Sequence, residues 1–347
     1  MLLAALALGG CAASENGSVE GPVTVYVSLP LTGPRADAGR DAADGARLAL
    51  DDAEGRAGEL EVRAEYLDDA RGAAWDPVAV GQNARRATED SSTAAYIGEL
   101  DSEPTRASVP ITNEAGIAQI SPGAGAVDLT RPAAGYEDSP DRYRPTGDPS
   151  FVRVIPADDV LARGASELVQ RLDAERVELD FENTPHGRLT EEELSTDAAE
   201  IGLEVVARGG DAVLAGGAEE GLRLRPTRGR GGLEGEGEVA AALDPARLPD
   251  PDFAADFERT YDRPPGPYAA YGYEAMELAL AAIADAAGAD QDFRGGVVDA
   301  VLGAERPDSI LGRYSITEEG DSTLCAVQPY AGGGGERRPE APLCPGG

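Results

Sequence analysis

Residues 23–53 of the chain are VTVYVSLPLTGPRADAGRDAADGARLALDDA, and this stretch decides the fold. The first seven residues, 23–29, are apolar or β-branched, which favours a buried strand. A loop rich in proline and glycine follows at 30–34 and breaks that strand. From about Asp37 onward alanines recur three and four residues apart, which predicts a helix with one apolar face. The stretch is therefore a strand–loop–helix unit.

The same order recurs through the first half of the chain. Further strands are predicted at 59–67, 94–100 and 116–120. A helix is predicted at 77–90, opened by a proline, and another follows the strand at 94–100. Strands that alternate with helices form a parallel sheet with right-handed crossovers.

A segment rich in proline, glycine and charged residues, 131–150, interrupts the alternation, which then restarts. The strands predicted beyond it are 151–155, 176–181, 203–207 and 212–214. The helices predicted beyond it are 158–172, one that ends near residue 202, 252–261 and 268–288. The Gly- and Arg-rich segment 221–238 has few apolar residues, and no core element is predicted there. The fold class expected is α/β, with two doubly wound Rossmann-like lobes.

Composition excludes several classes of function. The chain has 347 residues with 64 acidic side chains against 30 basic ones, all arginine, and a formal net charge of −34. Such a field repels phosphate backbones and anionic lipid headgroups, so we expect no nucleic-acid partner. His186 is the single histidine, which rules out a metal site built on two histidines and makes any catalytic triad depend on it. No metal and no cofactor is predicted.

The N-terminus indicates export. Residues 2–8 (LLAALAL) are a short apolar stretch, typical of a signal peptide and too short to span a membrane. The string Leu8-Gly9-Gly10-Cys11 resembles the bacterial lipoprotein box, in which the cysteine carries the lipid. We therefore expect Cys11 to be lipidated and residues 12–22 to be a flexible tether.

Two other cysteines, Cys325 and Cys344, remain near the C-terminus. An even pair of cysteines in an exported protein is typical of a disulfide, and two free thiols are the alternative.

The loops after the strands are where a ligand is expected, because ligands of open parallel sheets bind beyond the carboxyl ends of the strands. The loops in question are Leu29–Gly33, Asp101–Thr105 and Ser121–Gly125. In the second loop Asp101 or Ser102 can cap the next helix, whose N-terminus attracts an anion such as a carboxylate. The hydroxyl groups of Ser102 and Thr105 could add hydrogen bonds, although a capped helix without a ligand explains this string equally well.

Several strings together resemble a known family. They are VSLPLTGPRADAGRDAADGARLALDDA (27–53), then YLDDARGAAWDP, YIGELDSEPTRASVPITNEAGIAQISPGAGAVDLT, FVRVIPADD, NTPHGR and GPYAAYGYEAMELALAAI. In that order, over most of residues 23–290, they resemble the periplasmic binding proteins of type I. More narrowly, they resemble the leucine/isoleucine/valine-type substrate-binding proteins of ABC importers.

The resemblance implies two lobes joined by a multi-strand hinge, which close on a small ligand. Residues 23–150 with 255–312 would form lobe 1, and residues 151–254 with 313–347 would form lobe 2 and a tail.

The resemblance also implies a ligand site. The loop with Ser102 would bind the ligand carboxylate, and the loop Ser121–Gly125 would bind carboxylate and ammonium, through backbone groups at Gly123 and Ala124. His186 is expected to line the cleft from the second lobe. The full set of candidate ligand residues is Leu100, Asp101, Ser102, Thr105, Ser121, Gly123, Ala124, Gly125 and His186.

The chain departs from the pattern of this family in several places. Branched-chain binders usually have a hydroxyl residue where this chain has Gly125, and often an aromatic residue near Ala38. An aromatic residue is also common after the strand at 212–217, where Ala218 stands here. The acidic residue that receives the ammonium should lie in 219–238, where Glu234 and Glu236 are weak candidates.

Three functions remain open at the level of the sequence. The first is a lipid-anchored, monomeric solute-binding protein outside the cytoplasm, which delivers a branched-chain amino acid or similar small polar ligand to an ABC permease. The second is a sensor or docking lipoprotein of the same fold with a degenerate site. The third is a hydrolase built on paired carboxylates, but pairs such as Asp68-Asp69 are expected by abundance among 64 acids and to lie on solvated faces or helix caps. The chain is expected not to be an enzyme.

Overall fold

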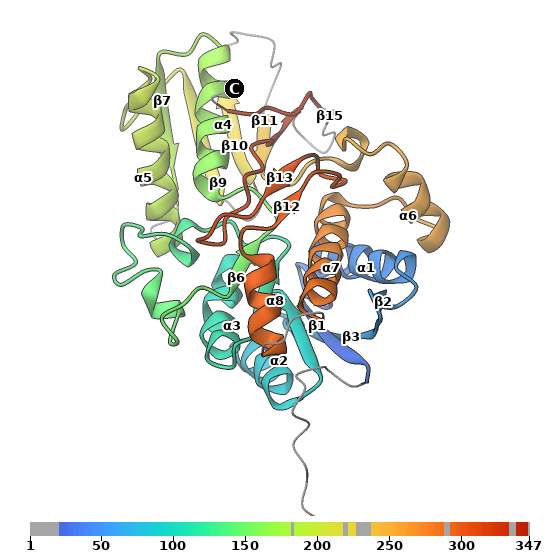
Figure 1. Cartoon of the computed structure of the whole chain (residues 1–347). Coiled ribbons are helices and arrows are strands. Elements are labelled where there is room, and N and C mark those ends of the chain that lie inside the picture. Colours follow the sequence, from blue (N-terminus) through green and yellow to red (C-terminus); the bar gives the residue numbers. More distant parts are fainter. Residues whose placement is uncertain are drawn as a thin grey trace, which may run out of the picture.

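The computed structural model places two α/β halves one above the other, as Figure 1 shows. The residues that it describes are 21–181, 184–217, 221–226, 237–287, 292–332 and 338–345. Cys11 and the glutamates Glu234 and Glu236 lie outside them. Within the described ranges no helix combines the length and the apolar character needed to cross a membrane.

The first half is built on a six-stranded sheet. Its strands, in spatial order, are β2 (Arg56–Ala57), β3 (Leu60–Asp68), β1 (Val23–Leu29), β4 (Thr93–Ile97), β5 (Ala118–Ser121) and β6 (Phe151–Arg153). All neighbours in this order run parallel except β2 and β3. The parallel sheet predicted from the alternating pattern is therefore present, and it takes in β6, beyond the expected boundary of lobe 1 at residue 150. The lobe boundaries themselves stay a prediction.

Helices cover this sheet. They are α1 (Ala36–Asp52), α2 (Pro77–Glu89), α3 (Ser102–Glu114), α7 (Pro267–Ala286) and α8 (Phe293–Val301). Ala42, Ala46 and Ala49, which define the apolar face predicted for α1, have no exposed surface. Because these side chains are small, α1 packs closely along α7, which is itself almost wholly buried.

The second half is built on a seven-stranded sheet. Its strands, in spatial order, are β15 (Arg338–Pro339), β14 (Gln328–Ala331), β11 (Gly237–Ala240), β10 (Gly221–Pro226), β9 (Ala212–Gly217), β7 (Arg176–Asp180) and β8 (Glu204–Val205). The helices α4 (Asp158–Arg171) and α5 (Pro185–Glu200) accompany it, and α6 (Phe253–Tyr261) follows. The remaining elements are the short pair β12 (Glu305–Arg306) and β13 (Tyr314–Ser315), and the 3₁₀ turns η1 (Val127–Leu129), η2 (Asp141–Tyr143) and η3 (Pro245–Arg247).

The second sheet is mixed, which the predicted parallel alternation does not anticipate. Only β7, β8 and β9 are parallel, and the strands from β9 to β15 pair antiparallel. Three residues separate β9 from β10, too few for the crossover of a dozen residues that a parallel neighbour requires.

We predicted no core element in residues 221–238, and this prediction was wrong for β10. In this strand Leu222 and Leu224 are fully buried while Arg223 and Arg225 are exposed. This alternation is the period-2 signal of a half-buried strand, and the surrounding glycines and arginines obscured it.

The chain passes between the halves after β6, after β11 and after β13, and a buried arginine joins two of these passages. Arg153 at the end of β6 has no exposed surface, and its Nε lies 3.0 Å from Asp321 Oδ1. Its guanidinium also donates to the carbonyl oxygens of Ala124 and Ala126, each at 2.9 Å. Arg131 Nε donates to the other Asp321 oxygen at 2.7 Å. Burial alone would raise the pKa of Asp321, but the charges of Arg153 and Arg131 outweigh burial and hold the pKa below its usual value.

Replacement of Asp321 by alanine should destabilise the fold by about 3–5 kcal/mol, because it leaves the buried Arg153 charge uncompensated. Urea denaturation at pH 7 measures this free energy. Asp256→Ala is the control, since Asp256 pairs with Arg259 at 2.7 Å on an exposed helix surface and should cost under about 1 kcal/mol. Equal costs for the two variants would contradict the structural role of Asp321.

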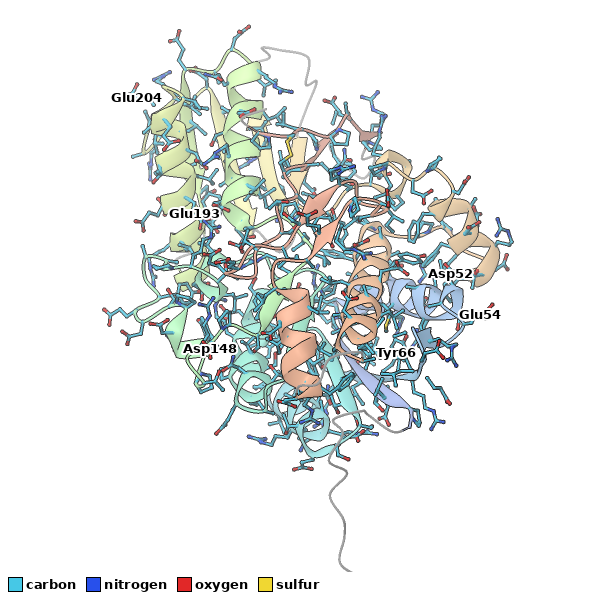
Figure 2. The ribbon with its side chains drawn as sticks, viewed as in Figure 1. Asp52, Glu54, Tyr66, Asp148, Glu193 and Glu204 are labelled. Atoms are coloured by element: carbon cyan, nitrogen blue, oxygen red, sulfur yellow. A yellow bond between two sulfur atoms is a disulfide. The ribbon has the colours of Figure 1, made fainter. Side chains whose placement is uncertain are left out.

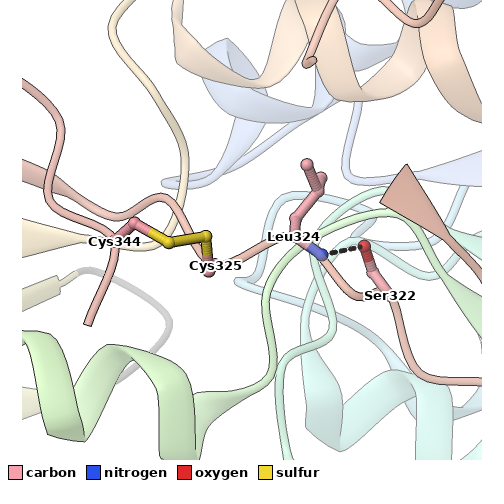
Figure 3. Close-up of a disulfide and its surroundings, with 4 residues drawn as sticks. All are labelled: Ser322, Leu324, Cys325 and Cys344. Carbon is pink, nitrogen blue, oxygen red and sulfur yellow. Dashed lines mark hydrogen bonds between the residues drawn. A yellow bond between two sulfur atoms is a disulfide. The ribbon is translucent and has the colours of Figure 1, made fainter. Parts of the chain in front are cut away.

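A disulfide closes the C-terminal segment that carries β14 and β15. Cys325 and Cys344 are bonded, with their Cα atoms 4.9 Å apart (Figure 3). Both strands lie between the two cysteines in the chain and form the edge of the second sheet. The disulfide therefore fixes this edge.

Replacement of both cysteines by serine should lower the free energy of unfolding by about 3 kcal/mol, the chain entropy expected for a loop with a sequence separation of 19 residues. Urea titrations of the parent and the double variant, both without reductant, measure the difference. Adding a reductant should then lower the urea midpoint of the parent and leave the midpoint of the double variant unchanged. If the urea midpoint of the parent does not change when reductant is added, the stabilising role of the disulfide is contradicted.

Candidate functional site

Two loops meet at the carboxyl edge of the first sheet, one between β4 and α3 and the other after β5. The hydroxyl of Ser121 donates to the carbonyl oxygen of Glu99 at 2.7 Å, and the hydroxyl oxygen of Ser102 accepts from the backbone N–H of Ala126 at 3.1 Å. These bonds bring together all the predicted ligand residues except His186. Those brought together are Leu100, Asp101, Ser102, Thr105, Ser121, Gly123, Ala124 and Gly125.

The hydroxyl groups of this edge bond to the loops themselves. Ser121 Oγ accepts from the backbone N–H groups of Gly123 at 3.2 Å and Ala124 at 2.8 Å. Thr105 Oγ1 donates to the carbonyl oxygen of Asp101 at 2.8 Å. Ser102, Thr105 and Ser121 are all buried. The hydroxyl groups of Thr105 and Ser121 and the backbone N–H groups of Gly123 and Ala124 are therefore already hydrogen-bonded within the loops.

Glycine at 125 is explained by a carboxylate from the second half. A Cβ built on Gly125 would lie 2.1 Å from Asp158 Oδ1, at the first residue of α4. The backbone N–H of Asp158 also donates to the carbonyl oxygen of Gly125 at 2.8 Å. Asp158 thus fills the space that a hydroxyl side chain would need at this position.

An ion pair lies beside Ser102, and it was not predicted from the sequence. Asp101 occupies the N-cap position of α3, yet its side chain makes no capping hydrogen bond. It instead accepts from Arg35, whose Nε and Nη2 lie 3.0 and 2.6 Å from its two carboxylate oxygens. The guanidinium carbon of Arg35 is 5.7 Å from the ring centroid of Tyr268, in the first turn of α7.

Tyr268 also closes the space around Gly123. A Cβ at Gly123 would lie 2.4 Å from the carbonyl oxygen of Leu100 and 3.2 Å from Tyr268 Cε1, so only glycine fits. Tyr271, on the same helix, is 1% exposed and packs in the hydrophobic core. Arg35 and Tyr268 bring opposite ends of the chain to this edge, and no local pattern in the sequence signals such a contact.

Two acids are buried directly beneath the edge. Asp69, which follows β3, is 1% exposed, and Glu99, which follows β4, is 0% exposed. Glu99 Oε1 accepts from the Tyr96 hydroxyl at 2.6 Å, while Glu99 Oε2 and both Asp69 oxygens lack a hydrogen-bond partner among the described residues. The solvated position expected for Asp68-Asp69 was therefore wrong for Asp69.

Burial disfavours the ionised form of both acids. Burial raises the pKa of Asp69 to about 8, and the nearby charge of Asp101 adds to this. Burial raises the pKa of Glu99 as well, with the charge of Asp69 as the next cause. Two carboxyl groups in so dry a place are not both ionised at neutral pH, so the folded state binds a proton there that the unfolded chain does not.

Asp69→Asn should flatten the dependence of stability on pH. Because the pKa of Asp69 is higher in the folded state than in the unfolded chain, its proton stabilises the fold. This contribution is fully present below about pH 4 and is lost as the pH rises toward about 8. The parent should therefore lose up to about 1.4 kcal/mol per pH unit in that window from this proton, and the variant should not. Urea denaturation at pH 5, 7 and 9 tests this, with Asp308→Asn at an exposed position as the control. An unchanged slope in Asp69→Asn would contradict the raised pKa of Asp69.

His186 lies apart from these loops, in the first turn of α5 in the second half. The helix begins at the N-cap Thr184, whose Oγ1 accepts from the backbone N–H of Gly187 at 3.0 Å. The His186 side chain lies outside the described part of the chain, as does Ala218, so their predicted roles stay predictions. Among the described residues no three acidic, histidine or cysteine side chains cluster in a way that could hold a metal ion.

The fold and this edge define a class of protein: two α/β halves, crossed three times by the chain, with ligand-type loops at the carboxyl edge of a parallel sheet. The family described as "Periplasmic binding protein" matches residues 22–212. The chain belongs to the periplasmic binding protein family, which binds solutes and is not enzymatic. A search of the curated proteins found no match.

Solved structures of this class superpose over nearly the whole chain at low identity. A leucine-binding protein LivK from Thermotoga maritima is 18% identical, with a TM-score of 0.70 over 93% of this chain and 99% of that one. The substrate-binding protein LivJ of a branched-chain amino acid transporter from Streptococcus pneumoniae, in complex with isoleucine, is 15% identical, with 0.71 over 93% and 100%. A solute-binding protein of an ABC transporter from R. palustris, in complex with benzoate, is 16% identical, with 0.71 over 94% and 97%. These likenesses confirm the predicted fold class.

Proposed function

We propose that this protein binds an amino acid of the branched-chain type, or a similar small polar ligand, between its two halves and delivers it to an ABC permease. The observation that carries the proposal is the Arg35–Asp101 ion pair beside Ser102 at the N-terminus of α3. A zwitterionic ligand carries one charged group to match each charge of the ion pair. Its carboxylate suits Arg35, Ser102 and the positive end of the helix dipole, and its ammonium suits Asp101.

Burial favours such recognition. The side chains of Arg35 and Asp101 are 17% and 7% exposed, so an ion pair or charged hydrogen bond here is only weakly screened by water. The solved relatives in complex with isoleucine and with benzoate hold ligands that share a carboxylate. An amino acid uses both charges of the pair, whereas benzoate uses only the positive one.

The proposal extends to the place of the protein in the cell. With Cys11 lipidated, residues 12–22 would tether a monomer to the outer face of the bacterial cell membrane or within the periplasm. Ligand contacts to both halves would favour the closed arrangement, which the permease would recognise.

A second function is favoured by one observation. Asp158 fills the space at Gly125, and the amides of Gly123 and Ala124 are bonded to Ser121 within the chain. If these groups do not rearrange for a ligand, the protein is a sensor or docking lipoprotein with a degenerate site.

A thermal-shift screen of leucine, isoleucine, valine and benzoate, followed by calorimetric titration, tests the proposal. We expect a branched-chain amino acid to raise the melting temperature more than benzoate, because a ligand that binds only the folded state stabilises it. In Ser102→Ala the affinity should fall about 10-fold or more, the cost of one hydrogen bond to a charged group. Ser166→Ala, at a buried serine of α4, is the matched control and should bind like the parent. No shift with any of the four compounds would favour the second function.

A further inference from the structure

A cavity of about 300 Å³ lies at the junction of the two halves. One wall is the loop after β5, residues 127–134, and the others are the first turns of α4 and one face of α5. None of the predicted ligand residues lines it. Five of its lining residues are acidic: Asp159, Glu192, Glu193, Asp197 and Glu200.

Two of these acids have oxygens that are buried and unbonded. Both carboxylate oxygens of Glu193, which Figure 2 marks on α5, have almost no exposed surface and no hydrogen-bond partner among the described residues. The same holds for Asp197 Oδ2, and the Asp197 side chain is only 8% exposed. Buried polar atoms in folded proteins are nearly always hydrogen-bonded, so these three oxygens require an explanation.

The arginines nearby do not donate hydrogen bonds to these three oxygens. Arg163 lies 3.5 Å from the other Asp197 oxygen. Arg131 is bound between Asp159, at 3.1 Å, and Asp321, at 2.7 Å. Neither arginine therefore provides a hydrogen bond to the Glu193 oxygens.

The surroundings also affect the protonation of these acids. Burial raises the pKa of Glu193 to about 9, and the charges of Asp158 and Asp159 at the start of α4 add to this against the smaller effect of Arg131. Burial likewise raises the pKa of Asp197 to about 6, although Arg163 opposes it. An empty cavity thus keeps Glu193 as a neutral acid, and a bound cation would release its proton.

The chemistry of the walls selects the kind of cation. A metal ion needs several oxygens arranged around one point, and no such cluster exists among the described residues. Glu193 and Asp197 are four residues apart on α5, so their carboxyl groups are neighbours on one face. The wall also has apolar side chains, among them Val127 and Leu189, which suit a short alkyl chain.

We propose that this cavity binds a short alkylammonium cation, with its ammonium group between Glu193 and Asp197 and its alkyl chain against Val127 and Leu189. The proposal is independent of the function proposed above, since the two sites share no residue. Because the walls come from both halves, such a cation would also favour the present arrangement of the halves over one that separates them.

Calorimetric titration of the full chain with 1,4-diaminobutane at pH 8 tests the proposal, with 1,4-butanediol and sodium chloride at matched ionic strength as references. We expect saturable binding of the diamine only. Two buffers of different ionisation enthalpy should reveal proton release on binding, since Glu193 ionises as the cation enters. In Glu193→Gln the affinity should fall at least tenfold and the proton release should vanish.

Glu191→Gln is the matched control, because Glu191 is an exposed acid on the same helix that does not line the cavity. It should bind the diamine like the parent and thereby exclude general attraction to an acidic surface. Asp197→Asn is a second test variant and should also weaken binding. Equal affinity of the parent and Glu193→Gln, or no binding by the parent, would overturn the proposal while leaving the result of the amino-acid screen untouched.

Discussion

The buried ion pair between Arg153 and Asp321 is the constraint on which the rest of the structure depends. Arg153 has no exposed surface, and every oxygen that it meets comes from a loop or a crossing segment between the halves. Its backbone N–H donates to the carbonyl oxygen of Gly320 at 3.0 Å, so backbone and side chain both hold the third passage of the chain against the first. Removing Asp321 would leave the charge of Arg153 buried without its ion-pair partner, which is strongly destabilising.

This constraint reaches the candidate site through the loop after β5. Arg153 fixes the carbonyl oxygens of Ala124 and Ala126, and Ala126 in turn donates to Ser102. On the other side, Gly125 accepts from Asp158 at the start of α4. The loop that is expected to contact a ligand is therefore bonded to both halves, and a change in their arrangement is coupled to its geometry. That coupling is the physical requirement for a binding protein that closes on its ligand.

Much of the fold could be predicted from local patterns, while the decisive contacts could not. The alanine spacing of α1 and the strand–loop–helix units give the first sheet, because burial imposes periods of 3.6 and 2 on the sequence. The mixed second sheet was missed, since the short alternation in β10 lies among glycines and arginines. At the site, the positions of Ser102 and Ser121–Gly125 follow from strand ends and a family pattern. Arg35, Tyr268 and Asp158 come from distant parts of the chain, and only tertiary structure brings them together.

Some of the acidic side chains are buried at particular places in the fold, which the composition alone does not reveal. Most of the described acidic side chains are at least partly exposed, yet Asp69 and Glu99 are buried beneath the site, and Glu193 and Asp197 line a cavity between the halves. Buried acids of this kind are costly to ionise, so proton binding is linked to the stability of the fold at both places.

Small-angle X-ray scattering with and without saturating isoleucine tests most directly whether a solute is held between the two halves. The account predicts a smaller radius of gyration with isoleucine than without it, and in Ser102→Ala the same decrease only at isoleucine concentrations at least about tenfold higher than the parent needs. An identical radius of gyration for the parent in both conditions, at isoleucine concentrations where calorimetry shows binding, would contradict closure of the halves on the ligand.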